Sequence, residues 1–287
     1  MPYSLHPASD FSSPQLAALL NACYEDCYTP IRFHSDQFDF FVRTHDILLD
    51  QSLVARWGDE LIGLALLGRR DERGWISGLG VLPGRRRQGV ARALMSEVTE
   101  NARNLGIARL QLEVLSNNQP AIDLYTELGW RLGRELLVWE RPEFQGPLPI
   151  HRERWQEMDP AFLLENYFDA WHEEPPCWQR EKQTLLHYID IGMKGWAVVR
   201  EEGPVAYLLG FPPRDGRMPL MDVAVDPQVG YKSAGRALLQ NLHLAYNTTP
   251  QLPNEPVASS LNFLFAAMSY QVALRQNEMT LDLNKEK

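Results

Sequence analysis

The sequence reads VLPGRRRQGVA from Val81 to Ala91, and this stretch decides the fold because it joins an expected strand to an expected helix. Glycine at such a junction lets backbone N–H groups point into one concavity, and the start of the helix adds partial positive charge. We therefore expect an anion-binding loop, which three consecutive arginines strengthen. The alternatives are a solvated basic turn and a nucleic-acid patch, and the patch would need a wider basic surface with stacking aromatic residues.

Hydrophobic periodicity predicts the elements on either side of this loop. Apolar residues over 90–105 recur with the helical period of 3.6, and Gly106 caps the end. Residues 51–68 alternate around a Gly58-Asp59 turn, which is typical of a hairpin. The first half of the chain is thus expected to contain a strand near 3–6, a helix at 14–24, the hairpin, a strand at 75–82, the helix at 90–105, a strand at 109–115, a helix at 120–128 and a strand at 135–140. Such a mixture predicts an α/β fold with a mixed sheet flanked by helices.

The second half of the chain repeats this layout. Leu53 aligns with Trp196, 143 residues later, and Val81-Leu82-Pro83 aligns with Val225-Asp226-Pro227, 144 residues later. Leu124 to Trp130 can likewise be laid on Leu264 to Tyr270. Prolines and a glycine interrupt the pattern over 141–149, which is typical of a linker. We therefore expect two tandem copies of one αβ unit, at residues 1–144 and 145–287.

Several motifs of the first copy resemble the GNAT superfamily of N-acetyltransferases. The family signature, Gln/Arg-x-x-Gly-x-Gly/Ala at a strand-loop-helix junction, corresponds here to Arg86 through Ala91. Asn118-Gln119-Pro120-Ala121, Leu124-Tyr125 and Gly129-Trp130 follow in the order the family shows. Motifs in the right order are more specific than a single match. The resemblance implies two tandem GNAT-like domains, the first catalytic and the second degenerate.

The resemblance also implies which residues bind the co-substrate, acetyl-CoA. Its pyrophosphate is expected on the loop amides of Arg86, Arg87, Gln88, Gly89, Val90 and Ala91. Backbone groups from Leu79 to Val81 are expected to pair with the pantetheine arm, and one amide there would polarise the thioester carbonyl. Asn118 is expected to contact the pantetheine or to order the loop, with a helix N-cap as the alternative. No metal is expected.

Two residues match the proton transfers that acetyl transfer to an amine requires. Tyr125 is the candidate proton donor to the departing thiolate, since a phenol with a pKa of about 10 keeps its proton at neutral pH. A core aromatic is the alternative interpretation. Glu113 interrupts an apolar strand and faces away from Leu112 and Val114. Its position 12 residues before Tyr125 resembles ribosomal-protein N-acetyltransferases with a strand glutamate as general base, so the resemblance implies that role, with an exposed or ion-paired glutamate as the alternative.

The acceptor amine is expected near the segment CYEDCY, where the family places a variable helix and loop. Asp26 and Tyr28 are the candidate contacts, and a solvated helix face is the alternative interpretation. Three cysteines, Cys23, Cys27 and Cys177, show no metal-type spacing and are expected to be buried or half-buried thiols.

The second copy departs from the motifs. Gly230 stands in place of Arg86, Ser233 in place of Gly89, and Phe265 in place of Tyr125. Three prolines over 250–257 argue against a central strand there. We therefore expect a non-catalytic second domain that packs against the first, shapes the acceptor site or mediates self-association, although Lys232 and Gly235 leave binding of a CoA-like ligand open.

Composition limits the partners. The chain has 287 residues, 28 basic and 37 acidic, so its net charge of −9 disfavours nucleic acid. No segment has the length or character of a membrane span or a secretion signal, which favours a cytoplasmic protein.

The expected function is acetyl-CoA-dependent N-acetyl transfer to a small-molecule or peptide primary amine by direct transfer in a ternary complex. No cysteine lies where a covalent acetyl-enzyme would need one, and a homodimer is a compatible assembly. The alternatives are a non-catalytic acyl-CoA-binding regulatory module and a tandem acetyltransferase acting on an aminated sugar thiol.

Overall fold

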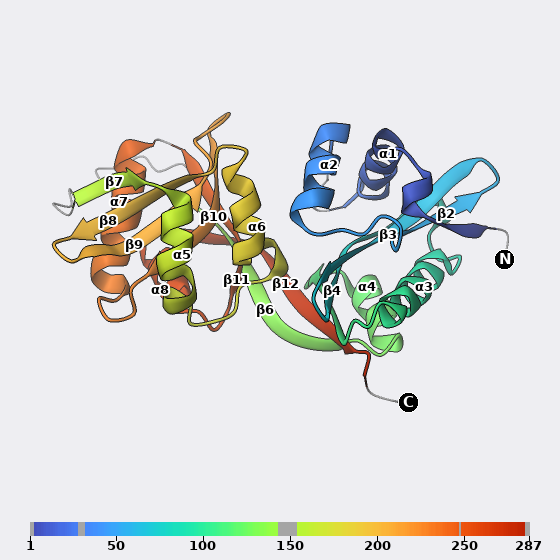
Figure 1. Ribbon diagram of the computed structural model, residues 1–287. Helices are drawn as coiled ribbons and strands as arrows, with labels where there is room; N and C mark the ends of the chain where they lie inside the picture. The colour runs from blue at the N-terminus through green and yellow to red at the C-terminus, as the bar shows by residue number, and fades with distance from the viewer. Residues whose placement is uncertain (1–2, 28–31, 143–153, 247, 285–287) are drawn as a thin grey trace. The chain divides into compact units, whose positions relative to one another are not determined.

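The computed structural model describes residues 3–27, 32–142, 154–246 and 248–284 (Figure 1). The chain divides into two compact units. The first comprises Met1–Gly133 together with Asn277–Lys287, and the second comprises Arg134–Gln276. Each unit has a mixed sheet with helices on both faces, as the sequence predicts.

The sheet of the first unit has the strand order β1-β2-β3-β4-β5-β12. Its strands are β1 (Ser4–Pro7), β2 (Leu53–Trp57), β3 (Glu60–Arg70), β4 (Arg73–Val81), β5 (Arg109–Leu115) and the last part of β12 (Gln271–Asp282). Its helices are α1 (Ser13–Cys23), α2 (Ser35–Thr44), α3 (Val90–Asn104) and α4 (Gln119–Glu127). Helix α2 was not predicted from the sequence, whereas every other expected helix and strand of the first half is present.

The first unit has one hydrophobic core on each face of its sheet, and the side chains of β5 alternate between the two faces. Leu110, Leu112 and Val114 lie in one core with Leu94 and Val98 of α3. On the opposite face α1 contributes Leu16 and Leu20 to a second core, which it shares with Phe38 of α2 and Leu64 and Leu66 of β3. Helix α1 begins where the Ser12 amide donates to Gln15 Oε1 at 2.9 Å, as in a capping box. The sheet therefore lies between α1 and α2 on one side and α3 on the other (Figure 1).

Strand β4 parts from β5 after three parallel residue pairs, Arg73–Arg109, Gly74–Leu110 and Trp75–Gln111. Against β3, Ile76 faces Leu67 and Gly78 faces Leu66, so Ser77 is an extra residue in the strand. An extra residue bends a strand and disrupts its pairing locally. Beyond this bulge the edge of β4 that faces β5 is not used for strand pairing. We call this region the β4–β5 divergence.

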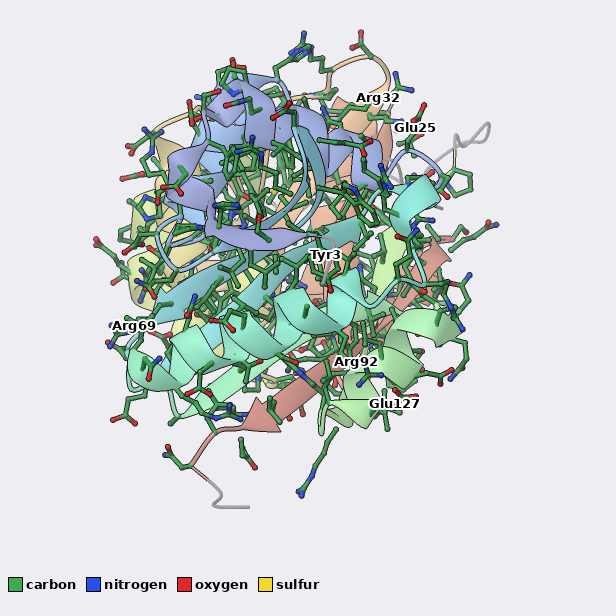
Figure 2. All side chains as sticks on the ribbon, turned by 90° about the vertical axis from the view of Figure 1, so that its right-hand side faces the viewer. Tyr3, Glu25, Arg32, Arg69, Arg92 and Glu127 are labelled. Atoms are coloured by element: carbon green, nitrogen blue, oxygen red, sulfur yellow. The ribbon has the colours of Figure 1, made fainter. Side chains whose placement is uncertain are left out.

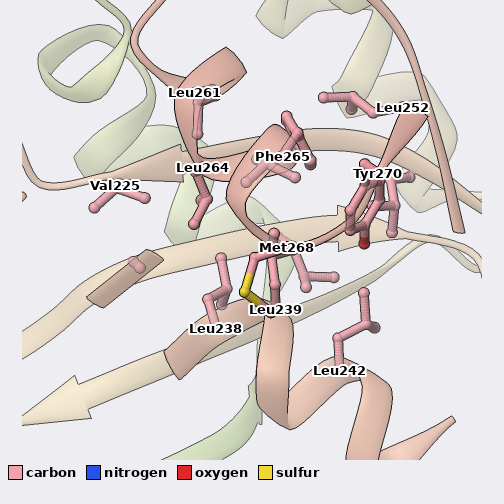
Figure 3. Close-up of a cluster of buried hydrophobic side chains, with 14 of the residues drawn as sticks. Val225, Leu238, Leu239, Leu242, Leu252, Leu261, Leu264, Phe265, Met268 and Tyr270 are labelled. Atoms are coloured by element: carbon pink, nitrogen blue, oxygen red, sulfur yellow. The ribbon is translucent and has the colours of Figure 1, made fainter. Parts of the chain in front are cut away.

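The second unit has the strand order β6-β11-β10-β9-β8-β7. Its strands are β6 (Arg131–Glu140), β7 (Arg154–Met158), β8 (Lys194–Arg200), β9 (Gly203–Gly210), β10 (Arg217–Val225) and β11 (Thr249–Pro256), and its helices are α5 (Pro160–Trp171), α6 (Lys182–Ile189), α7 (Arg236–Ala245) and α8 (Leu261–Ala267). Helices α7 and α8 pack leucines and Phe265 into one buried core (Figure 3). Leu163 and Leu164 of α5 lie in the core on the other face.

The two compact units of the structure do not have the same bounds as the domains expected from the sequence, which are residues 1–144 and 145–287. The expected boundary lies within 143–153, outside the described residues. Most of β6 belongs to the second unit, where it pairs with β11, and the end of β12 belongs to the first, where Met279 is fully buried. Local periodicity predicts a strand but not the sheet that it joins, because register is set by distant partners.

The expectation that prolines exclude a central strand at 250–257 was wrong. Strand β11 covers Thr249–Pro256 and lies between β6 and β10. Proline removes a donor but keeps its carbonyl. The Pro250 carbonyl accepts from the Arg141 amide at 3.1 Å, and the Pro253 carbonyl accepts from the Arg180 side chain at 3.4 Å. Prolines thus occupy positions where the carbonyl, rather than the missing N–H, makes the contact.

Replacing Gly80 by alanine is expected to destabilise the first unit. A Cβ at Gly80 would lie 2.5 Å from Cys23 Cβ, so β4 and α1 would have to move apart. Overpacking of this kind costs about 1–3 kcal/mol. Gly84→Ala is the matched control, since a Cβ there meets nothing within 4 Å, and it should change stability by less than about 0.5 kcal/mol. Urea unfolding measures both, and equal midpoints would contradict the close packing of β4 on α1.

Candidate active site

The loop between β4 and α3 has the backbone of an anion site. Arg87 has a φ of +63° and Gly89 a φ of +81°, and Gly89 is the N-cap of α3. Left-handed backbone of this kind favours glycine. The helix ladder starts with the Ala93 amide donating to the Gly89 carbonyl at 3.0 Å, so the amides before it belong to the first turn, which lacks intrahelical acceptors. These amides and the helix dipole suit a phosphate group.

Arg86 holds this loop to the rest of the unit. Its guanidinium makes a bidentate ion pair with Asp26, with both nitrogen–oxygen distances at 2.7 Å. The same side chain donates to the carbonyls of Val81 at 3.1 Å and Cys23 at 3.0 Å. The hydrogen bond to Arg86 lowers the pKa of Asp26, and the hydrogen bond to Asp26 raises the pKa of Arg86. Arg86 therefore contributes to the anion site mainly by positioning the loop.

The other two arginines of the loop lie differently. Arg85 pairs with Glu60, and its guanidinium carbon lies 4.7 Å from the centre of the Trp57 ring. Arg87 and Gln88 are exposed, and Gln88 donates to the Gly84 carbonyl at 3.4 Å. Arg87 is thus the arginine of the loop best placed to add positive charge for an incoming anion.

Tyr24 and Cys23, at the end of α1, pack against the free edge of β4. The Tyr24 hydroxyl donates to the Leu79 carbonyl at 3.0 Å. Burial raises the pKa of Tyr24, as it raises the pKa of Cys23 to about 12. Both groups are therefore neutral at physiological pH. Their place on β4 was missed by sequence reasoning, although the spacing Gly78-x-Gly80 signals a close approach to the strand.

The bulge of β4 presents one buried polar atom that suits a ligand. Ser77 Oγ is buried and has no hydrogen-bond partner among the described residues. Buried hydroxyl groups normally have a partner, so an unsatisfied one at a site needs an explanation. Ser77 therefore places a buried hydroxyl at the point where β4 and β5 part.

Tyr125 lies on α4 and is 7% exposed. An ion pair between Arg92 of α3 and Glu127 joins the two helices (Figure 2). The Tyr125 ring lies 6.1 Å from the Trp130 ring. Burial, and to a smaller extent the neighbouring Tyr24, raise the pKa of Tyr125. Tyr24 packs on the core of α1 and Tyr125 lies in the core of α3, so the two phenols belong to cores on opposite faces of the sheet.

Glu113 lies on β5 with its side chain on the face opposite Leu112 and Val114, as alternation predicts. The Trp75 indole N–H donates to Glu113 Oε2 at 2.8 Å. Trp75 in turn contacts aromatic rings of the α2 region, with His45 at 5.4 Å and Phe41 at 6.3 Å between ring centres. The structure therefore places Glu113 beside β4 at the base of the divergence, on the α2 side.

Three further residues were predicted to contact a ligand, namely Asn118, Asp26 and Tyr28. Asn118 is the N-cap of α4, and its Oδ1 accepts from the Ala121 amide at 3.4 Å, which matches the N-cap alternative. Asp26 is paired with Arg86, so an amine at Asp26 would share that carboxylate. Tyr28 lies outside the described residues.

The second unit differs from the first at the position of Tyr125 and in the loop before the long helix. Phe265, where the first unit has Tyr125, is fully buried and lies 5.8 Å from the Trp139 ring. The loop before α7 forms a π-helical turn over Tyr231–Gly235, and Gly235 at the N-cap of α7 has right-handed backbone, unlike Gly89. The helical backbone here begins after Gly230, which combines a φ of +83° with an extended ψ of 156°, whereas Gly89 has a ψ of −1°.

Among the described residues, no cluster of three or more metal-ligating side chains is present, and no helix is long and apolar enough to cross a bilayer. The first unit is thus a mixed αβ unit with an unpaired strand edge at the β4–β5 divergence and a loop at the start of α3 that suits an anion.

Comparisons identify the family to which this class of site belongs. Residues 14–130 match the Acetyltransferase (GNAT) family. A histone acetyltransferase of Arabidopsis thaliana is 31% identical over 193 residues, which cover 58% of this chain and 72% of the relative. An uncharacterised N-acetyltransferase of Mycobacterium tuberculosis is 37% identical over 81 residues, 28% of this chain and 52% of the relative. The chain belongs to the GNAT family, and membership implies acyltransferase activity.

Solved structures support the two-unit fold over the whole chain. A tandem GNAT protein from the clavulanic acid biosynthesis pathway has a TM-score of 0.76 at 14% identity, covering 99% of this chain and 100% of that one. A GCN5-related N-acetyltransferase from Sphaerobacter thermophilus has a TM-score of 0.71 at 17% identity, covering 99% and 97%. At such identities the likeness concerns the fold, and it confirms two tandem GNAT-like domains.

Arg86 and Arg87 are expected to behave differently when each is replaced by alanine. Arg86→Ala removes four hydrogen bonds that hold the loop, so it should lower both the affinity for acetyl-CoA and the melting temperature of the protein. Each kcal/mol lost in a domain of this size lowers the melting temperature by about 2–4 °C. Arg87→Ala should lower the affinity alone and reduce its dependence on salt. Titration calorimetry and thermal unfolding separate the two effects, and a stable Arg86→Ala protein with unchanged affinity would contradict the positioning role.

Proposed function

We propose that the protein is an acetyl-CoA-dependent N-acetyltransferase whose chemistry takes place in the first unit. The observation that carries the proposal is the loop before α3, whose backbone suits a phosphate, in the same unit as the buried phenol of Tyr125. Acetyl-CoA supplies the activated acetyl group as a thioester. The acceptor is a primary amine of a small molecule or a peptide, and the relative in Arabidopsis thaliana, named a histone acetyltransferase, is consistent with a peptide amine.

In the proposed arrangement the chain binds its co-substrate through backbone groups. The amides from Arg86 to Ala91 hold the pyrophosphate, and the edge of β4 from Leu79 to Val81 pairs with the pantetheine arm. An amide of the same edge polarises the thioester carbonyl, which is the oxyanion-stabilising contribution in acyl transfer. Ser77 Oγ gains a partner when the divergence is filled.

Two side chains carry the proposed proton transfers. Glu113 takes a proton from the ammonium form of the acceptor, directly or through water, so that the amine nitrogen can form the new bond to the acetyl carbon. Tyr125 gives its proton to the thiolate as the carbon–sulfur bond breaks. Burial raises the pKa of Tyr125, so the phenol is protonated before the reaction. The proton that the nitrogen loses as the amide forms then restores the phenol of Tyr125. Transfer is direct within a ternary complex, without an acetyl-enzyme.

The second unit is proposed to be non-catalytic. It has Phe265 in the position of Tyr125 and a different loop before α7. A location in the cytoplasm and self-association as a homodimer are part of the same proposal, and neither enters the mechanism.

Tyr125→Phe is expected to lower kcat by about 10²–10⁴ without weakening acetyl-CoA binding, because it removes the proton donor but keeps the buried ring. The measurement is steady-state kinetics with a panel of amines, together with titration calorimetry of acetyl-CoA. Tyr246→Phe is the matched control, since this half-buried tyrosine lies in the second unit. Full activity of Tyr125→Phe would exclude Tyr125 as the proton donor. A wild-type protein that binds acetyl-CoA but acetylates no amine would instead favour the non-catalytic acyl-CoA-binding alternative.

Glu113→Gln is expected to lower kcat by about 10²–10³, because an amide keeps the bond from Trp75 but cannot take a proton. The loss should be largest where the acceptor amine is mostly charged, so the rate should partly recover as the pH rises. Glu97→Gln, an exposed glutamate of α3, is the control. A Glu113→Gln enzyme with the wild-type rate at every pH would exclude Glu113 as the base.

A further inference from the structure

The second unit repeats the strand divergence of the first. In β10, Leu220 faces Gly210 and Asp222 faces Leu209, so Met221 is the extra residue, 144 positions after Ser77. Strand β10 pairs in parallel with β11 at Arg217–Thr249, Met218–Pro250 and Pro219–Gln251. These pairs correspond to the three pairs of β4 with β5. The second unit therefore has its own β10–β11 divergence.

A buried arginine bridges this second divergence. Arg180, from the short 3-10 helix Trp178–Arg180, is 1% exposed. Its Nε donates to the carbonyl of Met221, the bulge residue of β10, at 3.2 Å. Its Nη1 donates to the carbonyls of Pro253 and Asn254 in β11, each at 3.4 Å. One guanidinium therefore binds the backbone of both strands where their pairing stops.

Two buried carboxylates complete the site around Arg180. Asp222, which stands where the first unit has Gly78, accepts from Arg180 Nη2 at 2.8 Å, and Glu255 of β11 accepts from Nη1. Asp222 also accepts from the Tyr207 hydroxyl at 2.9 Å and lies 3.0 Å from His172 Nε2. Burial acts against the charged forms, yet the carboxylates raise the pKa of Arg180, and His172 with Arg180 lowers the pKa of Asp222. The two carboxylates balance Arg180 together with a protonated His172, whose pKa is raised by Asp222 against the effect of burial.

We propose that Arg180 is a built-in occupant of the β10–β11 divergence, so that the second unit does not bind acyl-CoA and the chain binds one acetyl-CoA. The inference rests on the proposed function, in which the β4–β5 divergence receives the pantetheine arm. A pantetheine in the second divergence would have to displace Arg180 and leave Asp222 and Glu255 buried without their cation. Leaving a buried charge unpaired is strongly unfavourable.

Hydrogen exchange of the full chain with and without acetyl-CoA, read by mass spectrometry, tests the inference directly. We expect protection of residues 77–91 and no change over 221–235 or 252–256, with calorimetry giving one equivalent per chain. Protection of β10 and β11, or two equivalents, would overturn the inference and leave the proposed function standing. If the protein binds no acetyl-CoA, both the proposed function and the expected stoichiometry of one acetyl-CoA per chain are wrong.

A second experiment tests whether Arg180 fills the divergence or only stabilises the fold from elsewhere, and it uses the variant Arg180→Ala with added guanidinium. The variant should melt at a lower temperature than the wild type, and low-millimolar guanidinium chloride should raise that temperature in a saturable way, because a ligand that binds the folded state stabilises it. Sodium chloride should not do so, and neither salt should stabilise the wild type or the control Arg236→Ala, an exposed arginine of α7. A variant that keeps the wild-type melting temperature and still binds one acetyl-CoA would show that Arg180 does not close the divergence.

Discussion

A β-strand with one extra residue cannot keep regular pairing on both of its edges, and the rest of this structure depends on that constraint. Ser77 interrupts β4, so its pairing with β3 continues while its pairing with β5 ends at Trp75. The backbone groups beyond that point need other partners, because buried N–H and C=O groups are costly when unpaired. Tyr24 satisfies the carbonyl of Leu79 in the first unit. The remaining edge is what the proposed chemistry uses.

The second unit meets the same constraint with a different solution. The bulge at Met221 leaves carbonyls of β10 and β11 without strand partners, and one arginine satisfies several of them. The fold has thus kept the bulge where the motifs for chemistry are lost. This contrast illustrates that a fold sets the geometry, while individual side chains decide whether a site carries a function.

Local patterns predicted those parts of the structure that depend on local interactions. The strand at 109–115 has the predicted bounds, and the helix beginning at Val90 is one residue shorter than predicted. The repeat offset of 144 residues recurs in the two bulges. The links that depend on distant residues could not be predicted. Asp26 and Arg86 are 60 positions apart, and Arg180 and Glu255 are 75 apart, so no periodicity connects them.

Helix α2 and strand β11 show two other limits of the sequence. Helix α2 is short but amphipathic, and Phe38 holds it in the core, so the helical pattern was present in the sequence although the helix was not predicted. Strand β11 contains three prolines, and its backbone bends where Asn254 has a φ of +55°. Its carbonyls contact Arg141 and Arg180, which are remote in the sequence. In β11 these tertiary contacts override the low strand propensity of proline.

The C-terminal residues Asn277–Lys287 belong to the unit that begins at the N-terminus, and this has a consequence for synthesis on the ribosome. Strand β5 is followed in its sheet by β12, Met279 is fully buried in the core of α3, and the Leu283 amide donates to the Ala108 carbonyl at 2.8 Å. After Gly133 has been made, 144 positions separate it from Asn277 (133 to 277). At about 5–20 residues per second, that takes about 7–30 s. During this time the edge of β5 is exposed to the pairing with foreign strands that native proteins avoid. The sheet of the first unit is therefore completed only after the second unit has been synthesised.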